Sequence, residues 1–260
     1  MSVPARLVAF LLVLLGTFGT AYAVGEKLPG HNHAGHNHTH GPASLVPPGF
    51  ESNGYRVVTD SVKVDGTTRV ATFHLEMTDG MRVTDFPESH GARLHTVLVR
   101  PDLSGFQHIH PEIADDGSWQ VTLGEPGPWH VVFDGAPDGN PVVVSANLDD
   151  EVAVEPQPLP EADDDVTIGG LRLVRKGLDF DVTAEDGSPA TGLQPYLGMA
   201  AHLIAIRQGD LSYVHLHPTM EMDGMFMFGN ALPQPGTYRI FLQFMRNGEV
   251  VTAPFTVVQQ

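Results

Sequence analysis

An internal duplication is the feature that most constrains how this chain folds. A histidine, twelve intervening residues and the tetrapeptide His-x-His-Pro occur at 95–111 and recur at 202–218, at a constant offset of 107. The same offset relates Phe73 to Phe180, and it rises to 109 from Pro235 onward because the second copy gains two residues. A repeat of this length has the size of an ordinary domain. We therefore expect two domains with the same fold.

The spacing of apolar runs and turn residues indicates an all-β fold. The 260 residues include 28 glycines and 21 prolines, and no long amphipathic helical pattern is evident. Seven runs of strand length, separated by turn residues, fill about 100 residues of the first copy, which is typical of a β-sandwich. We predict two tandem β-sandwich domains at 48–150 and 166–260, joined by a proline-rich acidic linker at 151–165.

The N-terminus predicts export from the cytoplasm. Arg6 precedes an apolar run, and the small-x-small triplet Ala21-Tyr22-Ala23 follows it, which are the three parts of a cleavable secretory signal. The 18 uncharged residues at 7–24 are also long enough for a membrane anchor. Segment 1–24 is thus a signal peptide or an anchor, and in both cases the remainder is extracytoplasmic and touches the membrane only through this segment.

A histidine-rich segment at 25–47 follows. It is polar and contains glycine and proline, so we expect a flexible tail without a core of its own. Short His-x-His tracts can gather several imidazoles around one ion and form exchangeable sites for copper, nickel or zinc. The alternative is a polar spacer. We interpret the tail as a metal-capturing segment through its five closely spaced histidines, His31, His33, His36, His38 and His40.

Strand pairing predicts how the repeated histidines lie relative to one another. In the second copy, a hairpin turn at Gly209-Asp210 places His202 opposite His217, with His215 on the same face. The same arithmetic in the first copy brings together His95, His108 and His110. Three imidazoles at this spacing can bind one transition-metal ion. The alternative is that these histidines bond to backbone or carboxylate groups and only orient a strand end.

Three further histidines of the first copy, His74, His90 and His130, have no histidine counterpart in the second. His90 is close in sequence to His95, so a fourth ligand in the first domain is one interpretation. We expect all three to be polar surface residues instead.

Methionines suggest which metal is bound. Met220 and Met222 closely follow His217-Pro218, with Met225 and Met227 nearby. Thioether sulfur is a soft ligand that favours Cu(I), so we predict that Met220 and Met222 contribute to a copper site. Core packing is the alternative, because methionine fills irregular gaps well.

Charge and cysteine content exclude several other classes of function. The net charge of −17 argues against nucleic acid as a partner, whereas it attracts cations. The chain has no cysteine, which excludes disulfides, thiolate metal sites and a cysteine nucleophile.

The His-rich tail, the sandwich pattern and the His-x-His-Pro hairpin together resemble a family of bacterial extracytoplasmic copper-handling proteins with immunoglobulin- or cupredoxin-like domains. The segment Leu193-Gln-Pro-Tyr-Leu-Gly198, followed by His202 and Tyr213-Val-His-Leu-His-Pro218, is similar to uncharacterised secreted or membrane-anchored members of this type. The resemblance implies a metal-associated role without naming an ion. Taken with the methionines, it leads us to predict copper, with zinc as the alternative, and another extracytoplasmic metal-handling protein as a partner. Without cysteine, a type-1 copper electron-transfer site is excluded.

Three classes of function therefore stay open. The first is a metal-binding protein with a three-histidine site in each domain, and the second is a structural or interaction protein whose histidines are architectural. The third is a metal-dependent enzyme, since three histidines with an open position can activate water. We favour metal binding without catalysis, because neither a nucleophile–base pattern nor paired carboxylates stand out, although Glu112 is suitably placed for a base.

Overall fold

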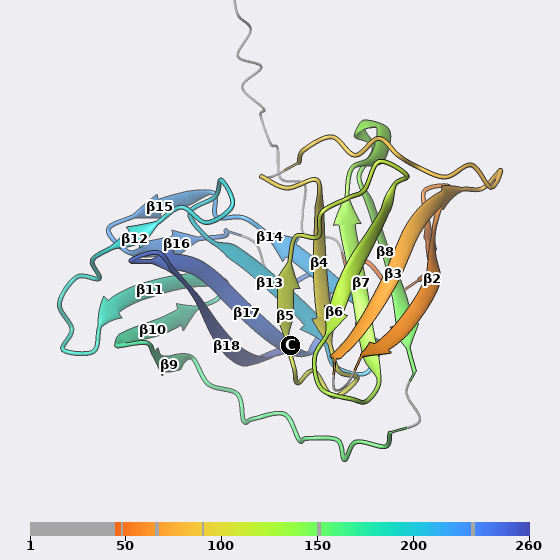
Figure 1. Ribbon diagram of the computed structural model, residues 1–260. Helices are drawn as coiled ribbons and strands as arrows, with labels where there is room; N and C mark the ends of the chain where they lie inside the picture. Colours follow the sequence, from red (N-terminus) through yellow and green to blue (C-terminus); the bar gives the residue numbers. More distant parts are fainter. Residues whose placement is uncertain (1–44, 48, 66–67, 90, 150–151, 230–231) are drawn as a thin grey trace, which may run out of the picture. The chain divides into compact units, whose positions relative to one another are not determined.

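The computed structural model describes residues 45–260 except 48, 66–67, 90, 150–151 and 230–231, and these residues belong to one compact unit (Figure 1). The predicted signal or anchor and the five tail histidines lie outside the described residues. Within the part that is described, no helix is long and apolar enough to cross a membrane.

The first half of the described chain consists of antiparallel strands. One sheet has the order β1-β2-β3-β6 and the other β5-β4-β7-β8. A 3-10 turn, η1 (Pro137–Gly139), precedes the last strand. The strands are β1 (Glu51–Ser52), β2 (Tyr55–Asp65), β3 (Thr68–Met77), β4 (Leu94–Val99), β5 (Gln107–Ile109), β6 (Ser118–Leu123), β7 (Trp129–Gly135) and β8 (Val142–Leu148).

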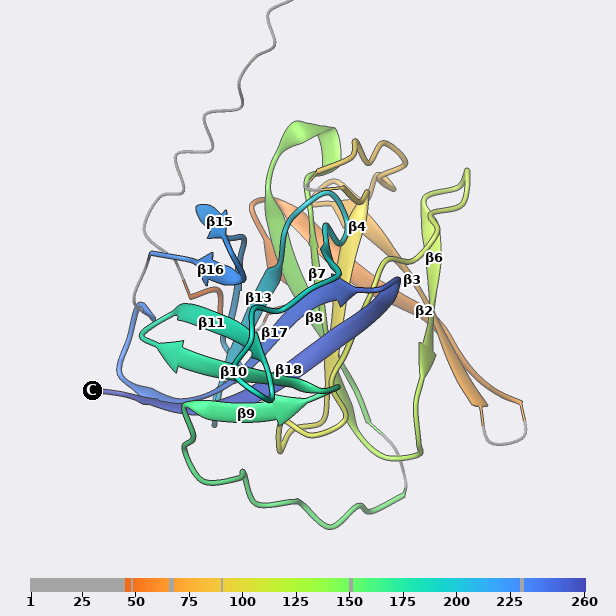
Figure 2. The same cartoon turned by 90° about the vertical axis from the view of Figure 1, so that its left-hand side faces the viewer.

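The second half repeats this arrangement. One sheet has the order β15-β16-β11-β10-β9, and the other has β12-β17-β13-β14 with β18 paired to β17 (Figure 2). The strands are β9 (Asp165–Ile168), β10 (Leu171–Lys176), β11 (Asp179–Ala184), β12 (Leu193–Gln194), β13 (His202–Arg207), β14 (Tyr213–Leu216), β15 (Met220–Met222), β16 (Met225–Met227), β17 (Gly236–Arg246) and β18 (Glu249–Gln259).

The two halves share one topology, as the duplication predicts. The series β5-β4-β7-β8 corresponds to β14-β13-β17-β18, and β2-β3-β6 corresponds to β10-β11-β16. All seven strands predicted for the first copy are present. The prediction of an all-β protein built from two sandwiches is confirmed, and no α-helix occurs among the described residues.

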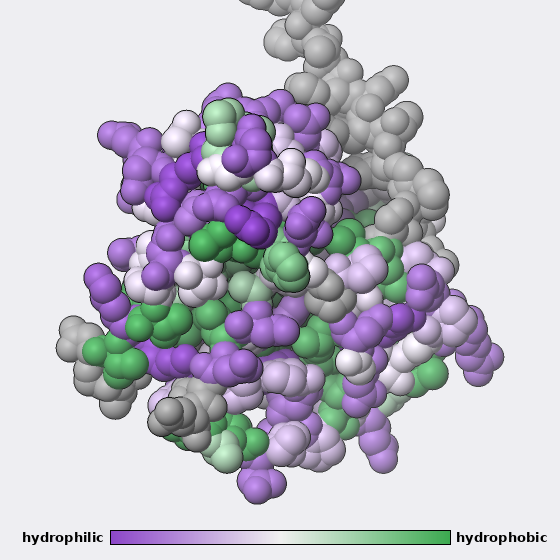
Figure 3. Space-filling model, turned by 90° about the vertical axis from the view of Figure 1, so that its right-hand side faces the viewer, coloured by the Kyte–Doolittle hydropathy of each residue, from purple (hydrophilic) through white to green (hydrophobic). Residues whose placement is uncertain are grey.

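Each half encloses its own apolar core between its two sheets. Aromatic side chains dominate both cores, because a large ring removes the most apolar surface from water. The first core is centred on Phe73, Trp119 and Phe133, which contact one another edge-on or stacked. The second core contains Phe226 and Phe244. Outside these cores, hydrophobic residues on the face seen in Figure 3 form separate groups among hydrophilic ones.

Strands β4 and β13 are buried on both faces, which distinguishes them from ordinary sandwich strands. One face of each strand packs into its own core. The opposite face carries Val97 and Val99 on β4, and Ile204 and Ile206 on β13, and these four side chains form a third apolar cluster together. The two halves therefore contact each other through the outer faces of two equivalent strands.

Segments flanking the sandwiches are also fixed to this unit. Val46 lies in the segment assigned to the tail, yet it forms an antiparallel bridge with Tyr213, with both N···O distances at 3.0 Å. Within the predicted linker, the backbone N–H of Gln157 donates to the Asp102 carboxylate at 2.6 Å. The linker thus follows the surface of the first half.

Candidate metal centre

The observed strand register agrees with the register predicted for both histidine hairpins. Leu203 pairs with Leu216 and Ile204 with His215, so the next position along places His202 opposite His217. In the first half Thr96 pairs with Ile109, which places His95 opposite His110. Opposed residues share one face of a sheet, so each hairpin presents three imidazoles on one side.

The turn of the second hairpin differs from the predicted two-residue turn. The Arg207 N–H bonds to Ser212 O, the Leu211 N–H bonds to Arg207 O, and Leu211 rather than Asp210 takes the left-handed φ of 57°. Asp210 instead pairs with Arg207 and accepts the Ser212 backbone N–H at 3.1 Å. The wider loop preserves the register, because the same residues of β13 and β14 face each other as in the predicted hairpin.

In the first half, the triad of His95, His108 and His110 converges on one point. Nδ1 of His95 lies 3.3 Å from Nε2 of His108 and 3.1 Å from Nε2 of His110, and the two Nε2 atoms are 3.2 Å apart. Nitrogen ligands about 2.0–2.1 Å from a tetrahedral ion are separated by roughly 3.3 Å. These three nitrogens are therefore spaced as three corners of a metal tetrahedron.

In the second half, His202, His215 and His217 repeat this geometry. Nδ1 of His202 lies 3.1 Å from Nε2 of His215 and 3.1 Å from Nε2 of His217. His202 is fully buried and His217 nearly so. All the ligand atoms of each triad lie within 4.8 Å of one another, so each triad is positioned to bind a metal ion.

Hydrogen bonds on the outer sides of the rings fix which nitrogen carries the proton. Nε2 of His95 donates to the carbonyl oxygen of Ser89 at 3.3 Å, and Nε2 of His202 donates to that of Tyr196 at 2.9 Å. Ser89 and Tyr196 are equivalent in the duplication, 107 residues apart. In the neutral ring the inward Nδ1 then carries a lone pair, which is the form that ligates metal.

The middle histidines of the two triads are oriented from the opposite half. Nδ1 of His108 donates to Oε1 of Gln243 at 2.7 Å, and Nδ1 of His215 donates to Oδ2 of Asp134 at 3.3 Å. Gln243 presents its oxygen because its amide N–H donates to Thr252 at 2.8 Å. The inward Nε2 atoms of both rings are consequently lone-pair donors.

Hydrogen bonding alone does not explain this convergence. A shared proton can bridge one pair of nitrogens, but three nitrogens at mutual distances of 3.1–3.3 Å leave at least one lone pair facing another. A single cation at the centre attracts all three lone pairs at once. The donor set therefore fits a metal ion held by three imidazoles with a fourth position open.

Asp134 and Gln243 are the site residues that sequence reasoning missed. They occupy equivalent positions, 109 residues apart, on β7 and β17. Each is a polar residue within an otherwise apolar run of a central strand, and this isolated polarity was the signal that could have revealed them. Their link to the histidines depends on contact between the halves, which no local pattern encodes.

The prediction that His74 and His130 are surface residues is wrong. The His74 ring is buried and lies 3.0 Å from both Asp60 and Glu76, and His130 is buried with Nδ1 2.7 Å from Oδ1 of Asn147. Both lie outside the triads, and His90 lies outside the described residues. His74 is hydrogen-bonded at both ring nitrogens, which indicates a structural role and makes it a useful control for metal binding.

The methionines form an exposed face on the hairpin of β15 and β16. Met220 pairs with Met227 and Met222 with Met225, so all four thioethers lie on one face. Met220 and Met222 are more than half exposed, whereas Phe226 and Phe228 on the opposite face are buried in the core. The core alternative therefore applies to the phenylalanines and not to these two methionines.

Burial and neighbouring histidines lower the pKa of His108 and His110 in the first triad. Burial, followed by His95 and His202, lowers the pKa of His110 to about 4. Burial, followed by His215, lowers the pKa of His108 well below its ordinary value. Neutral imidazole is the ligating form, so protons compete little with metal near neutral pH.

These pKa shifts predict that the metal-free protein loses stability in weak acid. A histidine with a pKa of about 6.5 in the unfolded chain and about 4 in the folded one binds more protons when unfolded across that window. The free energy of unfolding should therefore be highest above about pH 6.5 and fall as the pH approaches 4. Urea titrations of chelator-treated protein at several pH values measure this. His110→Asn should flatten the dependence, and a stability that is constant or rises in acid contradicts the shifts.

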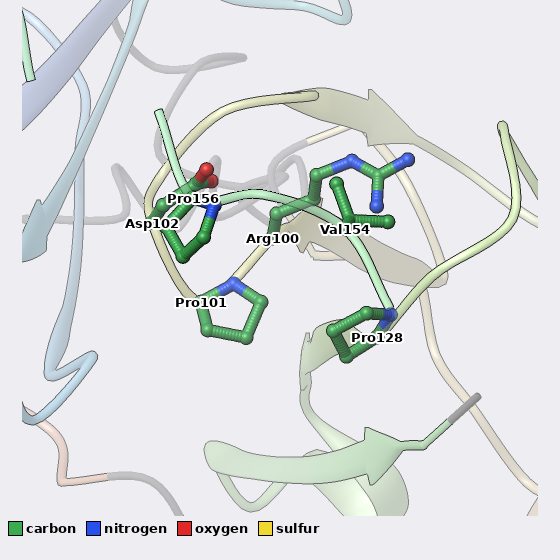
Figure 4. Close-up of a pocket in the computed structure, with 6 residues that line it drawn as sticks. All are labelled: Arg100, Pro101, Asp102, Pro128, Val154 and Pro156. Carbon is green, nitrogen blue, oxygen red and sulfur yellow. The ribbon is translucent and has the colours of Figure 1, made fainter. Parts of the chain in front are cut away.

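A pocket elsewhere on the first half does not belong to the centre. It is lined by the closed end of the β4–β5 hairpin, by the residue before β7 and by the linker, namely Arg100, Pro101, Asp102, Pro128, Val154 and Pro156 (Figure 4). His95 is five residues from Arg100 on an extended strand, about 17 Å at 3.3 Å per residue. None of the triad residues lines the pocket.

Comparison with known proteins identifies a family. A family model described as Domain of unknown function (DUF8832) matches residues 50–151 and 170–260, one segment in each half. No curated protein matches the chain.

Two solved structures show weak similarity. Dimeric latent PorU from Porphyromonas gingivalis is 10% identical with a TM-score of 0.25, covering 80% of this chain and 24% of that one. The 47-kilodalton lipoprotein Tp47 of Treponema pallidum is 14% identical with a TM-score of 0.24, covering 83% of this chain and 51% of that one. The chain thus spans about a quarter of the length of the first protein and about half of the length of the second.

Proposed function

This chain belongs to the family described as Domain of unknown function (DUF8832), and we propose that it is a metal-binding protein that holds one transition-metal ion at each histidine triad. The observation that carries the proposal is the convergence of three imidazole nitrogens in each half. They are 3.1–3.3 Å apart in the first half, and in the second half Nδ1 of His202 lies 3.1 Å from both of its partners. Duplication of the site favours stoichiometric binding over catalysis, so the proposed role is not enzymatic.

Copper is the proposed ion, with zinc as the alternative. Imidazole nitrogen suits both metals, and Cu(II) binds nitrogen ligands more tightly than the other divalent ions of the first transition row. The exposed face of Met220 and Met222 adds soft donors that favour Cu(I) during transfer. A second metal-handling protein is the proposed partner for that transfer.

Capture by the N-terminal histidines completes the proposal. In the sequence these histidines come shortly before Val46, which is bonded to Tyr213, two residues before His215. Short His-x-His tracts form exchangeable metal sites, so the proposed role of this segment is to collect ions for the triads. The export signal predicted from the sequence supports the proposed extracytoplasmic location, either secreted or anchored by segment 1–24.

Metal titration of the full-length protein tests the proposal. We compare the wild-type chain with a variant in which the five tail histidines are alanine, measuring bound Cu(II) and Zn(II) by calorimetry and elemental analysis. The tail variant is expected to retain two ions per chain. His74→Gln is the matched control, because it removes a buried histidine outside the triads, and it should also retain two ions. Loss of stoichiometric binding in the tail variant would leave the structural alternative, in which the triads only brace the two halves.

A further inference from the structure

The two triads lie against each other. The ring centroids of His95 and His215 are 5.0 Å apart, and those of His108 and His202 are 5.7 Å apart. Within the triads the corresponding separations are 5.5 Å between His95 and His108 and 5.4 Å between His202 and His215. Rings from opposite halves are therefore as close as rings of the same triad.

Strand alternation explains why these rings meet. His95, Val97 and Val99 occupy alternate positions on β4, and His202, Ile204 and Ile206 occupy alternate positions on β13, so each set shares one face. The apolar members of both sets pack together in the cluster between the halves. The histidines extend the same two faces and are brought together by the same contact.

Further equivalent residues pack on either side of this contact. Phe106 of the first half stacks on Phe241 of the second, with centroids 3.7 Å apart and ring planes 9° apart. Their counterparts in the duplication, Tyr213 and Val132, belong to the same cluster between the halves. The interface is thus built from matched residues of both copies and orients both triads together.

The ring positions limit how far apart two bound ions can be. An ion bound at 2.0–2.1 Å from an imidazole nitrogen lies about 3.2 Å from the centroid of that ring. The centroids of His95 and His215 are 5.0 Å apart, and adding about 3.2 Å on each side limits the distance between the two ions to about 11 Å.

We propose that the two triads form a single binuclear centre, assembled from both halves, in which two ions are held within about 11 Å of each other. This inference rests on the proposed metal binding. Neither half completes its own site, because the orienting partner of His108 is Gln243 and that of His215 is Asp134.

The two positions of this centre are chemically unequal. Asp134 is a carboxylate, which accepts hydrogen bonds from both His215 and the Tyr213 hydroxyl at 3.3 Å, whereas its counterpart Gln243 is a neutral amide. A carboxylate behind a ligating histidine raises the basicity of the ring more than an amide does. The triad of His202, His215 and His217 is therefore the first to fill.

Electron paramagnetic resonance of the full-length tail variant, loaded with Cu(II) as the probe, tests the binuclear centre. At one equivalent we expect the spectrum of an isolated, nitrogen-ligated Cu(II). At two equivalents we expect dipolar broadening or loss of integrated intensity, because the two spins interact at this distance. His110→Ala should bind one ion and keep the isolated spectrum. Two bound ions whose spectra merely add would overturn the binuclear centre while leaving metal binding intact, and absence of bound ions would overturn both.

The unequal positions are tested by exchanging the orienting groups. Asp134→Asn should weaken binding of the first ion about 10–100-fold in chelator competition, which is the usual effect of losing such a partner. Gln243→Glu should strengthen binding of the second ion without weakening the first. Circular dichroism checks that each variant is folded. If neither variant changes the affinity for either ion, Asp134 and Gln243 do not position the ligands, and the proposed difference in affinity between the two triads is wrong.

Discussion

Replacing His215 with alanine, in the variant without tail histidines, is expected to reduce the bound metal from two ions per chain to one. Its Nε2 lies 3.1 Å from Nδ1 of His202, and no other described donor of the triad replaces it. Loss of a partner behind a ligand already costs 10–100-fold in affinity, so loss of a ligand should cost at least about 100-fold. Competition with a chelator of known affinity measures the change.

The same substitution should remove the stabilisation that metal confers. An ion present at about 1,000 times its Kd adds roughly 4 kcal/mol to the free energy of unfolding, and the variant loses this increment for one of its two ions. His74→Gln retains both increments, since its ring bonds to Asp60 and Glu76 outside the centre. A His215→Ala protein that still binds two ions with unchanged affinity would refute the second triad as a site.

A second large effect is expected where two glycine turns meet. Gly91 and Gly198 are equivalent in the duplication and both have a positive φ, 80° and 79°. A Cβ on Gly91 would lie 2.1 Å from the carbonyl oxygen of Leu197, whereas a Cβ on Gly198 would meet nothing nearer than Gly91 Cα at 3.8 Å. Gly198→Ala should lower the free energy of unfolding by about 1–2 kcal/mol, because alanine is strained in the left-handed conformation. Gly91→Ala should lower the free energy of unfolding by the same strain and by about 1–3 kcal/mol more, because the backbone at residue 91 must move away from Leu197.

Urea denaturation of both glycine variants measures this difference, and Gly198→Ala is the matched control for backbone strain. The turns also carry the carbonyl groups of Ser89 and Tyr196, which hold His95 and His202. Gly91→Ala is therefore expected to weaken metal binding as well as stability. Equal losses of stability in the two variants would show that the turns do not press against each other in solution.

The sequence alone determined the fold class and the composition of each triad. The offset of 107 residues predicted two similar halves, and the period-2 alternation along a hairpin predicted that three histidines share one face. The hairpin prediction depends on local sequence only, because the turn sets the register of the two strands and the position along a strand sets the direction of each side chain. It held even where the turn itself differed, since Leu211 rather than Asp210 adopted the left-handed conformation.

Only the tertiary structure decided where these faces point. His74 and His130 were expected at the surface, but both rings are buried beside polar partners. Likewise, the outer faces of β4 and β13 meet because each is apolar, and burying one against the other removes both from water. That contact brings Asp134 to His215 and Gln243 to His108, at sequence separations of 81 and 135 residues. Such long-range pairing depends on how two folded surfaces fit, and no spacing within either copy specifies it.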